Sequence, residues 1–129
     1  ENAVYVVGDK CWYFVRQDEC MQGFLTAYDL KTGMWAVPTL IRDAQSRSDF
    51  LWLRDELYLI HAPIDRSGFG IVRINRENPA ASTPVAVADM HDSLFYPYTE
   101  PYGDYAYLSY TVSRRHIRLA RFPIAPFLG

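Results

Sequence analysis

An internal repeat constrains this chain more than any other feature of its sequence. Three segments align with one another and place Asp9, Asp55 and Asp104 at equivalent turn positions, 46 and 49 residues apart. Each aspartate precedes a segment in which aromatic and aliphatic residues alternate, which predicts a strand. A repeat of about 40 to 50 residues is typical of propellers and of other arrays of small sheets.

Each repeat is predicted to contain an antiparallel sheet. A second polar loop and a third strand follow every alternating segment, and a fourth strand is expected only twice, at Trp35–Leu40 and Thr83–Val87. Four-stranded units of about 45 residues are typical of β-propeller blades. We therefore expect an all-β fold and a single partial β-propeller over residues 1–129, with blades at about 1–42, 47–88 and 93–129, the last one lacking its outer strand.

Three blades do not close a ring, because propellers usually carry about four to eight. We favour a chain that is the C-terminal half of a six-bladed propeller, so that the expected partner is the N-terminal half. Alternatively, another copy of the chain completes the ring head to tail. A stand-alone β-sandwich of about eleven strands is the competing fold, and it would make the repeat accidental.

Composition excludes several classes of protein. The 129 residues are 50% hydrophobic and 16% aromatic, which suits packed strands and argues against disorder. The net charge is −2 and the basic residues are scattered, so neither nucleic acid nor a membrane surface is expected as the main partner. The sequence begins at Glu1 without a signal-like segment, so we expect a processed or cut piece. The compartment stays open, with a secreted or periplasmic location favoured.

The two cysteines are predicted to be free thiols. Cys11 and Cys20 fall near the base and the tip of one hairpin, separated by roughly four residues at about 3.3 Å each, which is too far for a disulfide. Neither has the spacing of a metal ligand. His61 and His116 lie on strands without acidic or cysteine companions, so we expect no metal and no cofactor.

Two parts of the sequence resemble a known superfamily. Phe95-Tyr-Pro and the later run Tyr105–Ala120, which contains Arg-Arg-His-Ile-Arg, resemble the last blade of sialidase-like (BNR-repeat) six-bladed propellers. The turn at Asp29–Trp35 is similar to the aspartate box of that superfamily, in which an aspartate caps turn amides and a tryptophan packs between sheets. The resemblance implies a carbohydrate-active protein, with glycoside hydrolysis of anionic glycans as the activity. The order of residues in 93–96 departs from the pattern around the sialidase nucleophile, and whether the chain is an enzyme stays open.

Ligand chemistry in a propeller is expected where the innermost strands begin and where the loops between second and third strands emerge. A pair of carboxylates about 5 to 9 Å apart can hydrolyse a glycosidic bond, and arginines can hold a sugar carboxylate in a bidentate clamp. The candidate catalytic residues are Asp49 and Asp92, and the candidate substrate-binding residues are Arg47, His91, Tyr96, Arg114 and Arg115.

Each candidate also has a structural interpretation. The aspartates can cap turns, the arginines and the histidine can be solvated loop residues, and Tyr96 can pack between blades. Three aromatic residues at matching places, Trp12, Tyr58 and Tyr107, are predicted to pack between blades rather than to bind sugar. The alternatives to a hydrolase are a non-catalytic glycan- or protein-binding propeller module and a structural fragment that assembles with its missing half or with itself.

Overall fold

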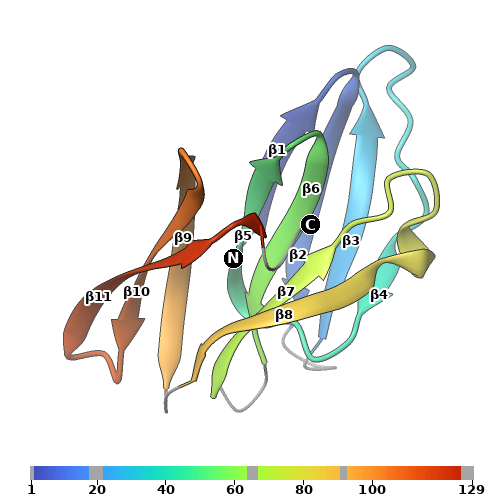
Figure 1. Ribbon diagram of the computed structural model, residues 1–129. Helices are drawn as coiled ribbons and strands as arrows, with labels where there is room; N and C mark the ends of the chain where they lie inside the picture. Colours follow the sequence, from blue (N-terminus) through green and yellow to red (C-terminus); the bar gives the residue numbers. More distant parts are fainter. Residues whose placement is uncertain (1, 18–21, 64–66, 91–92, 126–129) are drawn as a thin grey trace.

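The computed structural model describes residues 2–17, 22–63, 67–90 and 93–125, and it shows an all-β chain (Figure 1). Strands make up 69% of the described residues and form three separate antiparallel sheets, none of which closes on itself. The first sheet has the order β1 (Asn2–Val7), β2 (Lys10–Gln17), β3 (Gln22–Asp29) and β4 (Thr39–Ile41). The second has the order β5 (Gln45–Leu53), β6 (Glu56–Ala62), β7 (Gly68–Arg73) and β8 (Thr83–Met90). The third contains β9 (Leu94–Tyr102), β10 (Tyr105–Val112) and β11 (His116–Pro123).

The described strands confirm the predicted sheets of four, four and three strands. The fourth strand of the first repeat is the exception, because it was expected over Trp35–Leu40 and is observed only over Thr39–Ile41. Trp35 forms a single isolated bridge with Tyr28. Pro38 lies between the bridge and the strand and has no N–H to donate, so the ladder is interrupted there. A short 3-10 turn, Pro79–Ala81, precedes β8.

The three turns that define the repeat share a left-handed backbone. Gly8, Arg54 and Gly103 occupy the first turn position and have φ values of 58°, 47° and 59°. Positive φ at this position gives the tight hairpin whose twist matches that of the flanking strands. Glycine adopts this conformation without steric cost, whereas Arg54 adopts it against the preference of an L-residue.

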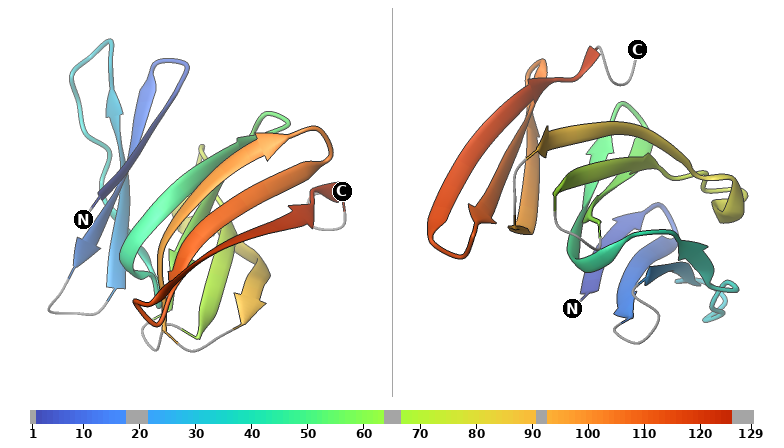
Figure 2. Two further views of the ribbon diagram at one scale, coloured as in Figure 1. Left: turned by 90° about the vertical axis from the view of Figure 1, so that its left-hand side faces the viewer. Right: turned by 90° about the horizontal axis from the view of Figure 1, so that it is seen from below.

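The middle sheet lies between the other two, and each of its faces contributes to one hydrophobic core (Figure 2). Strand β5 contacts both β1 and β9, so the first strands of the three sheets are neighbours. Trp12 is buried between the first and second sheets and Tyr58 between the second and third, which confirms the packing predicted for both. Tyr107, their equivalent in the third sheet, is half-buried and alternates with the core residues Ala106 and Leu108, so it lies on the opposite face.

No helix in the described parts of the chain has the length and apolar character needed to span a membrane.

Candidate functional site

A groove of about 250 Å³ lies where the first strands of the three sheets meet. Strands β1, β5 and β9 each contribute three consecutive residues to its lining. These three segments occupy nearly the same position in their respective repeats. Three of the seven predicted site residues, Arg47, Asp49 and Tyr96, therefore lie together. The lining residues are Asn2, Ala3, Val4, Arg47, Ser48, Asp49, Tyr96, Pro97 and Tyr98.

Arg47 and Asp49 are two residues apart on β5, and both line the groove. The pairing of β5 with β6 shifts between Gln45 and Asp49, so the strand is irregular where these side chains emerge. Such irregularities bend a strand and re-aim its side chains. The positive charge of Arg47 acts weakly to lower the pKa of Asp49.

Burial nevertheless raises the pKa of Asp49 above its ordinary value of 3.8, because desolvation outweighs the hydrogen bonds and Arg47. Its Oδ2 accepts hydrogen bonds from the backbone N–H of Thr99 at 2.8 Å and from the Thr99 hydroxyl at 3.1 Å. The hydroxyl also lies 3.3 Å from the Phe50 carbonyl oxygen. Asp49 thus connects β5 to β9, which is a structural role different from the turn cap considered above.

Tyr96 lies at a bulge in β9. Its φ is 55°, and the pairing of β9 with β10 shifts so that Tyr96 and Pro97 are opposite Tyr110. A positive φ at a bulky residue, here followed by proline, stores backbone strain, and such residues cluster at ligand sites. The side chain is 49% exposed at the groove. Tyr96 is therefore held in an uncommon backbone conformation beside Arg47 and Asp49.

The remaining predicted residues lie elsewhere. The guanidinium of Arg114 sits 4.8 Å from the centre of the Phe95 ring, a cation–π contact within the third sheet. Arg114 and Arg115 belong to the exposed turn between β10 and β11, and neither is among the described residues that line the groove. The structure thus does not place the predicted arginine clamp with Arg47 at this groove. His91 and Asp92 lie outside the described residues.

Among the contributors to the groove that were not predicted are Tyr98, which lines it, and Thr99, which is the partner of Asp49. Tyr98 follows Tyr96 by two residues on an alternating strand, so its exposed ring could have been inferred from that pattern. The role of Thr99 had no sequence signal, because it depends on how β5 and β9 are juxtaposed.

In the turn that resembles an aspartate box the aspartate caps turn amides as expected, whereas Trp35 is 58% exposed and packs on rings of its own sheet rather than between two sheets. Asp29 Oδ1 accepts hydrogen bonds from the backbone N–H groups of Lys31 and Thr32, at 2.9 and 3.1 Å. Its Oδ2 accepts a hydrogen bond from Lys10 Nζ at 3.0 Å, and these bonds lower its pKa to about 2, with Lys10 contributing most. Trp35 packs on Tyr28 of the adjacent strand. This turn is structural and lies apart from the groove.

A larger cleft of about 630 Å³ separates β4 from β7 and β8 and is lined mainly by apolar residues. His61 lines it, and burial lowers the pKa of this histidine because desolvation disfavours the charged ring. Gly70 lies opposite on β7, where a Cβ would come within 2.6 Å of His61 Nε2. The described residues contain no group of three metal-ligating side chains here or elsewhere. Cys11 is a free, half-buried thiol as predicted, and Cys20 lies outside the described residues.

Comparison with known proteins identified no matching family model and no significantly similar curated protein or solved structure.

Proposed function

We propose that the three sheets are blades of a sialidase-like β-propeller and that the groove between their first strands binds a carbohydrate. The arrangement of the strands supports this reading. Each repeat forms one antiparallel meander, and β5 lies against both β1 and β9, as innermost strands do around a propeller channel. The convergence of Arg47, Asp49 and Tyr96 on this groove is the observation that carries the proposal.

The chemistry of the groove suits an anionic sugar. Arg47 supplies a guanidinium that can hold a carboxylate through two parallel hydrogen bonds. The exposed rings of Tyr96 and Tyr98 offer flat apolar surfaces with polar tips, which suit a sugar ring with one apolar and several polar edges. A groove of about 250 Å³ is slightly smaller than the usual range for drug-sized ligands, so it suits a single sugar unit.

Hydrolysis of a bound glycoside is the catalytic form of this proposal. A carboxyl group with a raised pKa is suited to donate a proton to a leaving oxygen, and burial raises the pKa of Asp49 in this direction. The reaction needs a second carboxylate, for which the sequence offers Asp92. The bonds from Thr99 to Asp49 favour the alternative, a non-catalytic glycan-binding module, because they commit Oδ2 to holding two sheets together.

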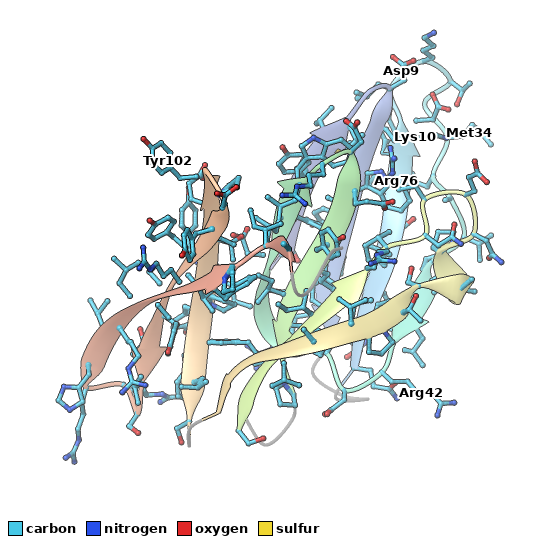
Figure 3. All side chains as sticks on the ribbon, viewed as in Figure 1. Asp9, Lys10, Met34, Arg42, Arg76 and Tyr102 are labelled. Atoms are coloured by element: carbon cyan, nitrogen blue, oxygen red, sulfur yellow. The ribbon has the colours of Figure 1, made fainter. Side chains whose placement is uncertain are left out.

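Binding can be tested by NMR titration with a sialylated trisaccharide and with the corresponding neutral disaccharide. We expect the wild-type chain to prefer the sialylated sugar, and Arg47→Gln to lose about tenfold of that preference, or about 1.4 kcal/mol. Tyr96→Ala should weaken the binding of both sugars. Tyr102→Ala is the matched control, because Tyr102 is an exposed tyrosine at the opposite end of β9 (Figure 3). Equal effects of the two tyrosine substitutions, or no binding of either sugar, would refute the proposal.

Catalysis is tested separately with a chromogenic sialoside. Turnover by the wild-type chain that Asp49→Asn abolishes while sugar binding persists would establish Asp49 as the acid. Sugar binding without any turnover would assign the non-catalytic form.

A further inference from the structure

The two end sheets each leave one face without a partner in the described structure, and the repeat shows what such faces normally contact. The middle sheet lies between the other two and is covered on both sides (Figure 2). The outward faces of the first and third sheets carry exposed apolar side chains. Because the repeats are equivalent, each exposed position can be compared with its own counterpart in a sheet that has a neighbour.

The third strands give the comparison for the outward face of the third sheet. Phe14, Ile60 and Ser109 lie five positions after the three turn aspartates. Their paired residues on the third strands, Leu25, Ile71 and Leu119, therefore occupy equivalent positions. Leu25 and Ile71 are 0% and 3% exposed, because the following sheet covers them, whereas Leu119 is 70% exposed. Ile117, two residues earlier on the same face, is also exposed. The third repeat therefore has an aliphatic residue, Leu119, at a position that is buried in the other repeats only because a following sheet covers it.

The first strands give the same result for the outward face of the first sheet. The residues five positions before the turn aspartates are Val4, Phe50 and Thr99. Phe50 and Thr99 are 4% and 5% exposed because they face the preceding sheet, whereas Val4 is 55% exposed. Val6 is exposed on the same face. The two unpartnered faces are thus of opposite kinds. The outward face of the third sheet is equivalent to faces that pack on a following sheet, and the outward face of the first sheet is equivalent to faces that pack on a preceding sheet.

We infer that a second copy of this chain, rather than the N-terminal half favoured from the sequence, covers both faces by head-to-tail association, because the two unpartnered faces of one chain match each other. The outward face of the third sheet in one copy packs on the outward face of the first sheet in the other, which repeats the contacts already formed twice within each chain. Two chains supply six sheets, within the range of about four to eight at which propellers close. This closure rests on the propeller arrangement proposed above. The groove residues of both copies then face one channel.

Exposed apolar residues that gather on one face of a sheet can mark an interaction surface. A head-to-tail contact between these faces has the same arrangement as the two contacts between neighbouring sheets within one chain. Contacts between two first sheets, or between two third sheets, would instead join faces of the same kind, for which the chain contains no precedent.

Light scattering coupled to size-exclusion chromatography tests the inference directly. At about 100 μM, where a contact with a Kd of ~10 μM is largely formed, we expect a mass of twice the 14.9 kDa of the chain. A mass of one chain would overturn the inference. Masses that continue to rise with concentration beyond two chains would overturn the closed pair.

Substitutions on the two faces separate head-to-tail association from a symmetric one. Val6→Lys and Leu119→Lys replace exposed residues, so both variants should fold, which circular dichroism checks. Each variant alone should run as a monomer, because both contacts of a head-to-tail pair would then contain a lysine. A 1:1 mixture should recover two-chain particles, because in the mixed pair one contact contains both lysines and the other contains none. Val87→Lys replaces an exposed residue of β8 that lines the cleft beside β4 and lies on neither outward face, so it should leave the mass unchanged.

If only one of the two face variants lost association, or if mixing restored nothing, the head-to-tail contact would be wrong. Loss of sugar binding without any change in mass would instead refute the proposed function and leave the association intact.

Discussion

Replacing Asp49 with alanine is expected to destabilise the chain by removing the bond that ties β5 to β9. The backbone N–H of Thr99 donates to Asp49 Oδ2 at 2.8 Å, and Thr99 is 5% exposed, so truncation leaves this N–H buried without its acceptor. An unsatisfied buried donor costs about 1–3 kcal/mol. The Thr99 hydroxyl still has the Phe50 carbonyl as an acceptor, so it adds little to this cost.

A second effect partly offsets the loss. The raised pKa of Asp49 shows that the fold disfavours the charged carboxylate, chiefly through desolvation, and alanine removes that penalty. We therefore expect Asp49→Ala to lower the free energy of unfolding by about 1–2 kcal/mol at pH 7. Asp49→Asn keeps an oxygen that can accept the Thr99 N–H and carries no charge, so its stability should lie close to the wild-type value.

The pH dependence distinguishes these contributions. Because the folded pKa of Asp49 lies above 3.8, the folded state binds the proton more tightly than the unfolded state, and this group's contribution to stability falls as the pH rises through that window. The Asn variant, which cannot titrate at this position, should gain stability relative to the wild type over the same rise in pH. An advantage that shrinks with rising pH would refute the assigned cause of the shift.

Urea unfolding followed by tryptophan fluorescence measures these differences, with all variants at one protein concentration because association also contributes to stability. Thr99→Val removes the hydroxyl but retains the N–H, so a double-mutant cycle with Asp49→Ala isolates the side-chain bond, expected at about 0.5–1.5 kcal/mol. The reasoning would be refuted if Asp49→Ala and Asp49→Asn were equally destabilised, or if Asp49→Ala cost nothing.

Three further predictions concern stability, each measured by the same unfolding assay. Gly70→Ala should cost about 1–3 kcal/mol, because its Cβ would meet the buried ring of His61; no loss would contradict the tight packing. Arg54→Gly should stabilise the chain by about 0.5–1 kcal/mol by relieving a φ of 47°, whereas Gly103→Ala should destabilise it. For Asp29, whose folded pKa is lowered to about 2, the stabilising contribution should be present above pH 4 and lost as the pH falls toward 2. Asp29→Asn should abolish that dependence, and an unchanged pH profile would contradict it.

The sheets could be predicted because the sequence carries their geometry in every repeat. Alternation with period two fixes which residues share a face, and the turn aspartates, preceded by glycine in two of the three repeats, mark where one strand ends and the next begins. The fourth strand of the first sheet was misjudged because alternation around Trp35 resembles a strand, while Pro38 removes the donor that a continuous ladder needs.

The groove was only partly predictable. Arg47, Asp49 and Tyr96 were selected because the starts of innermost strands converge in a propeller, and the structure does bring them to one groove. The bulge that reorients Tyr96 depends on a register shift between β9 and β10, which no local pattern reveals. The cation–π contact of Arg114 likewise depends on how a turn folds back on its own sheet. Both features are set by tertiary structure rather than by local sequence.

Alternation identifies an apolar face of a strand but does not say which surface covers it. Tyr107 matches Trp12 and Tyr58 in the repeat, so the sequence predicts the same packing for all three. The structure buries the two that have a following sheet and leaves Tyr107 on the outward face. Because Tyr107 is aromatic like Trp12 and Tyr58 and occupies the equivalent position, a further sheet packed on the third sheet is the best explanation for it. The aromatic content of the third sheet is therefore itself an argument that this face is covered in the working assembly, independently of what the groove binds.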